Sequence, residues 1–291
     1  MTDNSIKNKV WLITGSSTGF GNSLAKAILK QGECVVATAR RPEKLSKLIA
    51  QYPETARAIR LDVTQTQEVS DAVNDALNAF GRIDVLVNNA GYGALGAIEE
   101  LSNQIIRQQF ETNVFGALDV MRAVLPIMRK QRQGHIVNIS SVAGFVSFEG
   151  TGIYCGTKFA LEGISEALAK EVAPLGIKVT IIEPGAFRTD FNGRSLVTSE
   201  SIIDDYTSTS GEFLKWIRDM DGKQPGDPDK AALAIIQAIK SDNPPLRLAL
   251  GEDAVTAIDT KLTSVKEELT RWKMVACDTT FDGVKVGVIG G

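Results

Sequence analysis

The sequence predicts an α/β fold in which one doubly wound parallel sheet carries helices on both faces. Short apolar runs alternate with longer helical patterns along the 291 residues. The runs are β-branched and continuous, as expected for strands covered on both faces. A glycine-rich turn joins the first run to the first helical pattern. Because strand alternates with helix and no linker interrupts the chain, we expect right-handed crossovers within a single domain spanning residues 1–291.

The expected elements follow one another in regular alternation. The strands, about seven in number, are Val10–Thr14, Cys34–Thr38, Ala58–Leu61, Val85–Asn88, His135–Ser140, Val179–Glu183 and Leu246–Leu250. The helical patterns between and after them cover Gly19–Gln31, Pro42–Gln51, Gln67–Phe80, Asn103–Arg132, Ile153–Val172, Pro228–Lys240 and Asp253–Met274.

One stretch, at about residues 187–227, breaks this alternation. It begins after Pro184 and Gly185 and mixes polar residues with Phe191, Phe213 and Trp216. A segment this long without clear periodicity is usually a functional loop or disordered. Its apolar residues favour an insertion that folds over the substrate with short helices of its own.

Composition indicates a globular protein with a large core. Hydrophobic residues make up 43% and charged residues 23% of the chain, which is ordinary for such proteins. The net charge of −3 gives no basic surface for nucleic acid. No apolar run approaches the ~20 residues of a membrane span, so we expect no membrane partner. The polar N-terminus lacks a secretion signal, which favours a cytoplasmic location.

The cysteines and the single histidine predict neither a metal site nor a disulfide. Cys34, Cys155 and Cys277 are scattered and lack ligand spacing. His135 begins an apolar strand, where a structural role is a better interpretation than membership of a catalytic triad. Asn138 starts a glycosylation sequon, but it lies in the same expected buried strand, so we discount it.

The turn from Gly15 to Gly21 is a candidate phosphate-binding loop. Glycine allows a tight turn and a close approach to a ligand, and a helix N-terminus offers free N–H groups to phosphate. A glycine-rich turn alone is weak evidence, but this one lies between the first strand and the first helix. That context predicts dinucleotide binding.

The end of the second strand indicates which dinucleotide binds. An acid there binds the ribose 2′-hydroxyl of NAD, whereas arginine accommodates a 2′-phosphate. Here Ala39 is followed by Arg40 and Arg41. We therefore expect NADP(H); the alternative is that both arginines are solvated at the start of the next helix.

Tyr154 and Lys158 are a candidate acid/base pair. Four residues apart on a helix, their side chains share one face. A nearby cation stabilises a phenolate and lowers the pKa of tyrosine, which suits it to proton transfer. The same spacing is also common between ordinary surface residues, so its neighbours decide.

Further features accompany this pair in a specific order: the Gly15–Gly21 turn, Asn88 to Gly91, Asn113 and Ser141. In this combination the chain resembles the classical short-chain dehydrogenase/reductase family, whose sheet is of the Rossmann type. The resemblance runs from about Lys9 to Thr189, and the order of elements fits to about Leu250.

The resemblance implies four catalytic residues. Tyr154 would act as general acid in carbonyl reduction and as base in alcohol oxidation. Lys158 would bind the nicotinamide ribose and lower the pKa of Tyr154. Ser141 would orient the substrate oxygen, and Asn113 would hold a water that links Lys158 to solvent.

The resemblance also implies the cofactor-binding positions. Thr18 and Arg40 match positions that hold the 2′-phosphate in NADP-preferring members, and Asp62 would contact the adenine. The full expected set is Gly15, Ser17, Thr18, Gly19, Phe20, Gly21, Arg40, Arg41, Asp62, Val63, Asn89, Ala90, Gly91, Tyr154, Lys158, Pro184, Gly185 and Thr189.

Two functional interpretations stay open at this point. The first is an NADP(H)-dependent oxidoreductase that interconverts a hydrophobic ketone or aldehyde and its alcohol, since the loops after the strands are mostly apolar. The second is a non-catalytic NADP(H)-binding regulator on the same fold. Family members commonly pair through the helix of Tyr154 and the long helix before it, so a homodimer or homotetramer is a hypothesis.

Overall fold

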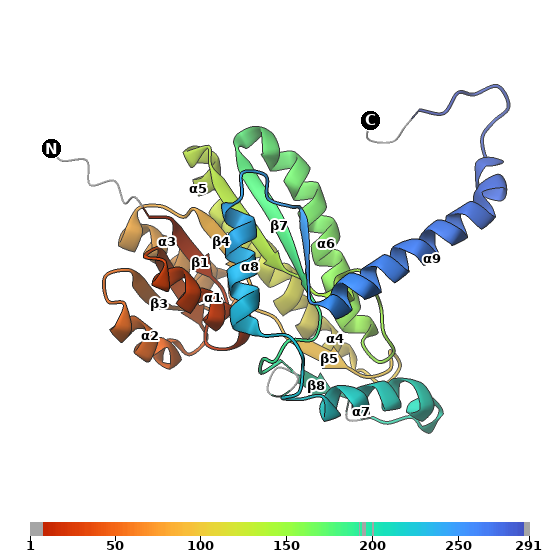
Figure 1. The fold of residues 1–291 in the computed structure, drawn as a ribbon, viewed down its shortest axis with the longest axis horizontal. Coiled ribbons are helices and arrows are strands. Elements are labelled where there is room, and N and C mark those ends of the chain that lie inside the picture. The colour runs from red at the N-terminus through yellow and green to blue at the C-terminus, as the bar shows by residue number, and fades with distance from the viewer. Residues whose placement is uncertain (1–7, 192, 194–195, 200, 288–291) are drawn as a thin grey trace.

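A seven-stranded parallel sheet forms the centre of the computed structural model, which describes residues 8–191, 193, 196–199 and 201–287 (Figure 1). The strand order is β3-β2-β1-β4-β6-β7-β9. All seven expected strands are present, with ends within two residues of those predicted. They are β1 (Val10–Ile13), β2 (Cys34–Ala39), β3 (Ala56–Arg60), β4 (Val85–Asn88), β6 (Gly134–Ile139), β7 (Ile177–Pro184) and β9 (Arg247–Leu250).

Helices cover both faces of this sheet, and the apolar runs pack on both. On β1, Val10 and Leu12 contact one core while Trp11 and Ile13 contact the other. The first core lies under α3 (Thr66–Phe80), α5 (Ala117–Gln131) and α6 (Gly152–Val172). The second lies under α1 (Gly19–Lys30), α2 (Ser46–Gln51), which continues a 3-10 turn at Pro42–Leu45, and α8 (Pro228–Lys240).

The long helix expected at 103–132 contains a π-helical turn. It consists of α4 (Asn103–Phe110), the π turn Glu111–Gly116 and then α5. Gly116 passes so close to β3's following loop that an added Cβ would lie 2.7 Å from Cγ2 of Val63. This π turn lies beside the loop that follows β3, and it carries Asn113.

The segment at 187–227 has short elements of its own. Its β8 (Leu196–Thr198) pairs in parallel with β5 (Gly93–Leu95), which follows β4. Beyond β8 come the 3-10 turn Asp204–Tyr206, the π turn Thr207–Gly211 and α7 (Glu212–Asp219). The small second sheet was not predicted, because two three-residue strands give too little pattern to recognise.

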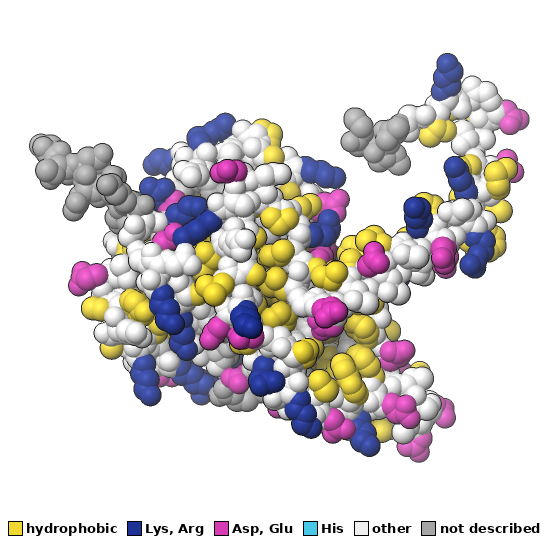
Figure 2. Space-filling model, in the orientation of Figure 1, with side chains coloured by type: hydrophobic (Ala, Val, Ile, Leu, Met, Phe, Trp, Pro, Cys, Tyr) yellow, Lys and Arg dark blue, Asp and Glu magenta, His cyan; other side chains and the backbone are white. Residues whose placement is uncertain are grey.

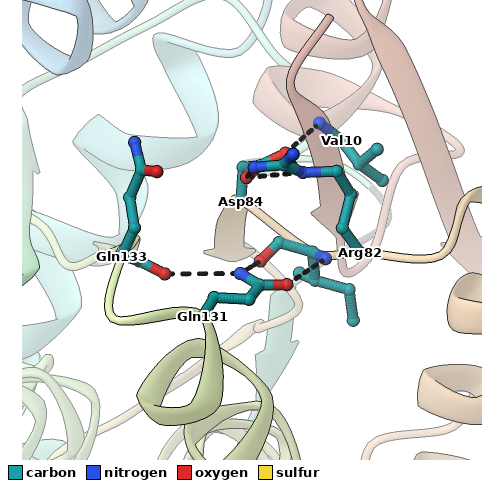
Figure 3. Close-up of polar contacts among 6 residues, drawn as sticks. Val10, Arg82, Asp84, Gln131 and Gln133 are labelled. Carbon is teal, nitrogen blue, oxygen red and sulfur yellow. Dashed lines mark hydrogen bonds and ion pairs between the residues drawn. The ribbon is translucent and has the colours of Figure 1, made fainter. Parts of the chain in front are cut away.

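The amino-terminal edge of the sheet is held by polar contacts around Asp84 (Figure 3). Its carboxylate accepts hydrogen bonds from the backbone N–H of Val10, at 2.9 Å, and from the Arg82 guanidinium. Gln131 at the end of α5 bonds both backbone groups of Ile83. These contacts fix β1 against β4, the two strands whose other ends carry the site.

His135 and Asn138 have structural partners inside the sheet. The His135 Nε2 lies 2.9 Å from the Thr180 hydroxyl, which itself donates to the Pro245 carbonyl, so Nε2 is the donor. Burial lowers the pKa of His135 to about 4. Asn138 is fully buried and donates to the Ser165 hydroxyl. No helix in the described ranges is long and apolar enough to cross a membrane.

The last helix of the described part of the chain is α9 (Glu252–Cys277), which extends away from the sheet (Figure 1). Its range agrees with the expected helix 253–274 to within three residues. Of its side chains only Ala254 is buried. Residues 278–287 follow the helix, and residues 288–291 lie outside the described ranges.

Candidate active site

The site lies where the strand order reverses, between β1 and β4. The chain leaves β1 toward β2 on one side, and β4 continues the sheet on the other. Loops at such a point diverge and leave a crevice at the carboxyl ends of the strands. Gly15, in the turn after β1, lies very close to Ala90, in the loop after β4. A Cβ added at Gly15 would lie 3.0 Å from the Ala90 Cα.

The glycine turn needs glycine for two physical reasons. Gly15 and Gly19 have φ of +69° and +55°, in the left-handed region that other residues rarely adopt. Gly21 does not have a left-handed backbone conformation, but it has no room for a side chain. A Cβ there would lie 2.6 Å from the Asn89 Nδ2 and 2.7 Å from the Gly15 carbonyl oxygen. The turn is therefore packed as tightly as its backbone allows.

Asn89 and Thr14 hold the turn in place. The Asn89 Nδ2 donates to the carbonyls of Thr14 and Gly15, each at 2.9 Å. The Thr14 Oγ1 accepts from the backbone N–H groups of Asn89 and Ala90, each at 3.0 Å. Thr14, which begins the glycine motif in the sequence, was not among the expected site residues, although a polar residue that closes an apolar strand was a usable signal.

The N-terminus of α1 fits a phosphate group. Its N-cap, Thr18, makes no side-chain hydrogen bond to the first turn, so the first N–H groups of the helix lack a side-chain acceptor. Ser17, Thr18, Gly19 and Phe20 all line the central cavity. Free helical N–H groups beside a glycine cradle are the donor set that a dinucleotide pyrophosphate requires.

The end of the cavity beside β2 carries positive charge. Arg40 and Arg41 line it and are exposed, and Ala39, the last residue of β2, offers no carboxylate. Arg60 donates to the Arg40 carbonyl at 2.9 Å and so fixes that backbone. Asp62 also lines the cavity, with its Oδ1 occupied by the N–H and hydroxyl of Thr64.

Ser141, Tyr154 and Lys158 meet at the other end. Ser141 follows β6, and its Oγ accepts from the Ala143 N–H at 3.1 Å and donates to the Pro184 carbonyl at 3.5 Å. The Lys158 Nζ donates to the Ile139 carbonyl at 2.8 Å and lies 5.8 Å from the centroid of the Tyr154 ring. One turn of α6 thus presents the phenol and the ammonium to the same end of β6.

Burial has the largest effect on the pKa of both Tyr154 and Lys158. It raises the pKa of Tyr154 above its ordinary 10, and the hydrogen bond with Ser141 opposes this rise. It lowers the pKa of Lys158 to about 8, against the pull of Glu162. We expected Lys158 to lower the pKa of Tyr154; here the loss of hydration outweighs any such effect, because the ring is almost completely enclosed.

Asn113 is tied to structure rather than open to the cavity. Its Nδ2 donates to the Tyr92 carbonyl at 2.9 Å and to the Thr157 hydroxyl at 3.1 Å, while its Oδ1 accepts from the Tyr92 N–H. The π turn therefore ties the loop after β4 to α6 directly beside Lys158. Extra-wide turns of this kind occur frequently at functional sites.

A buried acidic pair lies behind Lys158. Glu162 and Glu183 are both almost fully enclosed, and the Arg247 Nε lies 3.0 Å from one carboxylate and 3.6 Å from the other. Burial, and then the Glu162 charge, raise the pKa of Glu183 to about 7, while Arg247 lowers it. Sequence reasoning missed this cluster; the lone arginine in the apolar strand β9 was its one visible sign.

One cavity of about 1130 Å³ joins these parts. Of the expected site residues, only Asn113 and Gly21 do not line it; both lie in the layer beneath. Those that do are Gly15, Ser17, Thr18, Gly19, Phe20, Arg40, Arg41, Asp62, Val63, Asn89, Ala90, Gly91, Ser141, Tyr154, Lys158, Pro184, Gly185 and Thr189.

The 187–227 segment forms an aromatic wall beside Tyr154. The Phe191 ring lies 5.5 Å from the Tyr154 ring, centroid to centroid. Phe213 stacks on Phe148 at 5.6 Å and contacts Trp216 at 5.5 Å. All of these line the cavity. An apolar reactant at the Tyr154 hydroxyl would therefore lie against aromatic rings.

Known proteins match the part of the chain that carries this site. The model of the short chain dehydrogenase family matches residues 9–198. An oxidoreductase from Botryotinia fuckeliana is 41% identical over 85% of the chain and 90% of its own length. A 3-ketodihydrosphingosine reductase from Bacteroides thetaiotaomicron is 39% identical, over 84% and 88%.

Solved structures of similar proteins have the same fold. A short-chain dehydrogenase from Streptomyces avermitilis is 47% identical with a TM-score of 0.90, over 94% of this chain and all of that one. The protein ElxO with NADP bound is 29% identical with a TM-score of 0.71, over 86% of this chain and 99% of that one. Each of these proteins carries the same arrangement of sheet and helices.

Proposed function

The chain belongs to the short-chain dehydrogenase family of oxidoreductases, and we propose that it interconverts a hydrophobic ketone or aldehyde and the corresponding alcohol with NADP(H). One observation carries the proposal: Ser141, Tyr154 and Lys158 converge on the wall of the same cavity that contains the glycine turn. Proton transfer and dinucleotide binding thus share one space. Asn113 in the π turn bonds Thr157 in α6 and Tyr92 in the loop after β4, and so fixes the helix of Tyr154 and Lys158 against that loop.

The preference for NADP(H) rests on charge at the ribose edge. Arg40 and Arg41 line the cavity there, and no carboxylate at position 39 competes for a ribose hydroxyl. A guanidinium pairs with a phosphate in bidentate fashion, with both charge and geometry matched. The relative ElxO was solved with NADP bound, which agrees with this preference.

A bound nicotinamide dinucleotide supplies or accepts the hydride. The side chains of this protein then manage the proton and the developing charge. In reduction, Tyr154 gives its phenolic proton to the substrate oxygen while the Ser141 hydroxyl donates a hydrogen bond to it. The ketone has then gained one hydride and one proton, and Tyr154 regains its proton from solvent.

Lys158 prepares Tyr154 for this step. Its ammonium would hydrogen-bond the nicotinamide ribose and stabilise the phenolate left behind. The Ile139 carbonyl fixes its position at 2.8 Å, and Glu162 favours its charged form. Since burial alone raises the pKa of Tyr154, a nearby positive charge is what the proton transfer needs.

The aromatic wall favours an apolar substrate. Phe191 and Phe213 present ring faces and edges without hydrogen-bonding groups, and the only polar group of the Trp216 ring is its indole N–H. A phosphorylated or highly hydroxylated reactant would lose hydration there without replacement. The relative from Bacteroides thetaiotaomicron is named as a reductase of a keto compound, in agreement with this class of substrate.

The test is a screen of NADPH and NADH oxidation against aromatic ketones, long-chain ketones, aldehydes and diketones. We expect turnover with NADPH, and Tyr154→Phe should reduce kcat at least 100-fold while leaving the NADPH Kd within about twofold. Arg40→Ala should weaken NADPH binding at least tenfold and leave NADH binding unchanged. Equal loss for both cofactors would refute the role of Arg40 in binding the 2′-phosphate.

The alternative of a non-catalytic NADP(H)-binding regulator makes a different prediction. The wild-type protein would bind NADPH and turn over none of these carbonyl compounds or their alcohols. Tyr154→Phe would then bind NADPH as the wild type does and change no rate. Tight NADPH binding together with that inactivity would replace the enzymatic proposal.

A further inference from the structure

The helix α9 exposes an apolar stripe along most of its length, and within the described ranges Ala254 is its only buried residue. From the root at Ala254 the helix leaves the sheet and its covering helices (Figure 1). Leu262, Leu269 and Trp272 are 52%, 68% and 59% exposed. Apolar atoms are visible along the projecting helix in Figure 2. A soluble domain rarely exposes such a continuous apolar surface unless something covers it.

The stripe has the spacing of a coiled coil. Its members follow one another at alternating steps of three and four residues, which keeps them on one side of a helix over three heptads. They are Val255, Ile258, Leu262, Val265, Leu269, Trp272 and Ala276. The period is that of a helix that packs against one other helix along its whole length.

We propose that this stripe is a dimer interface, in which α9 packs antiparallel against α9 of a second copy of this chain. In the register that we assign, Leu262 faces the partner's Val265 and Ile258 faces the partner's Leu269. Val255 then faces the partner's Trp272. Because the two helices are identical and antiparallel, each layer occurs twice about a two-fold axis, as a closed dimer requires.

Charge complementarity selects this arrangement. The same register places Asp259 beside the partner's Lys266, Lys261 beside the partner's Glu268, and Glu252 beside the partner's Lys273. Flanking positions of this kind set the orientation and register of paired helices. Over the described part of the chain, none of these six side chains forms an ion pair with its own molecule, so all are available to the partner.

Other arrangements of two helices bring like charges together. A parallel pair places Lys261 beside the partner's Lys266. An antiparallel pair shifted by one heptad places Lys266 and Glu268 each beside its own copy, or, in the other direction, Asp259 and Lys261. Like charges at these positions destabilise a coiled coil. Among these arrangements, the assigned register alone has only opposite charges at its flanks.

The first experiment is sedimentation equilibrium of the full-length protein and its charge variants. We expect the wild type to associate, and Lys261→Glu or Glu268→Lys alone to weaken that step at least tenfold, because each creates two repulsive pairs per dimer. The double variant should recover the wild-type association. Glu267→Lys, the same charge change on the outer face of the helix, is the matched control and should have no effect.

Three outcomes would overturn the proposal. A wild type that does not associate, or that keeps its full association in Leu269→Asp, would show that the stripe is not an interface. Stronger association of Lys261→Glu would indicate parallel helices. Circular dichroism of each variant checks that α9 stays helical, so that an unfolded helix is not mistaken for a lost contact.

The second experiment uses the exposed Cys277, since Cys34 and Cys155 are buried. Spin labels on Cys277 should lie about 40 Å apart in the antiparallel dimer, because each end of the 26-residue helix lies beside the other's start. Parallel helices would bring the labels within about 20 Å. A distance that stays unchanged in Leu269→Asp would also refute the pairing.

Discussion

Gly21→Ala is the change that best separates a packing role in the cofactor loop from the general effect of glycine on a helix. Gly21 lies in the first turn of α1, and its added Cβ would lie 2.6 Å from the Asn89 Nδ2 and 2.7 Å from the Gly15 carbonyl. Neither neighbour can move freely. The Asn89 amide is fixed by two hydrogen bonds, and the Gly15 carbonyl accepts one of them.

The magnitude follows from two opposing effects. Alanine in place of glycine stabilises a helix by about 0.5–1 kcal/mol. Overpacking a tight site costs about 1–3 kcal/mol, and displacing the Asn89 amide weakens two hydrogen bonds worth about 1 kcal/mol each. The clash outweighs the gain, so we expect a net loss of about 2 kcal/mol in unfolding free energy.

The matched control is Gly163→Ala in α6. Gly163 is exposed, and an added Cβ there meets no atom within 4 Å, so only the helix effect remains and stability should rise by about 0.5–1 kcal/mol. Urea unfolding measures both variants, and NADPH fluorescence titration should show at least tenfold weaker binding for Gly21→Ala alone. Equal stability changes in the two variants would refute the packing argument.

Four further predictions concern the buried charges and the substrate wall. Reductive kcat/KM should fall as pH rises above about 8, because the Lys158 ammonium, whose pKa is lowered to about 8, then loses its proton. Glu162→Gln should move this fall in kcat/KM to lower pH, because the Glu162 charge raises the pKa of Lys158. Glu183 has a folded pKa of about 7 against 4.5, so stability should fall as pH rises from 4.5 to 7, by up to about 3 kcal/mol, and Glu183→Gln should flatten the urea-unfolding profile. Arg247→Met should destabilise by about 3 kcal/mol at pH 8, since two buried carboxylates lose their partner, and a milder loss in the Glu183→Gln background would confirm that cause. Trp216→Ala should raise KM for apolar ketones severalfold with NADPH affinity unchanged; a matching loss of NADPH affinity would argue against a substrate role.

The parts of the fold that could be predicted are those whose signal is local. β1, β2 and β4 are continuous apolar runs, and a run buried on both faces has the same appearance wherever it occurs. The glycine turn was recognisable because its strand and helix flank it directly in the sequence. Element ends were less certain, since β3 begins two residues and β7 two residues before the expected positions.

The parts that could not be predicted depend on contacts between distant residues. The π turn at 111–116 inserts one residue into an otherwise regular helix, and only its neighbours Val63 and Tyr92 explain why it is there. The small sheet of β5 and β8 joins segments about a hundred residues apart. The buried pair of Glu162 and Glu183 comes from α6 and β7, and neither residue alone indicates an unusual pKa.

The two halves of the cavity are held together by different forces, which explains why the sequence describes one better than the other. The cofactor half is built from strand ends, where the side chains of Thr14 and Asn89 each bond the backbone of the other across the switch point. The substrate half depends on Glu100, whose carboxylate accepts from the Ala97 and Ile203 N–H groups, and on stacked aromatic rings. The sheet brings positions 14 and 89 together, and the Thr14 hydroxyl and the Asn89 amide then supply the bonds. Ring contacts depend on which side chains the segment carries and on how it folds, so the sequence predicts the cofactor half of the cavity better than the substrate half.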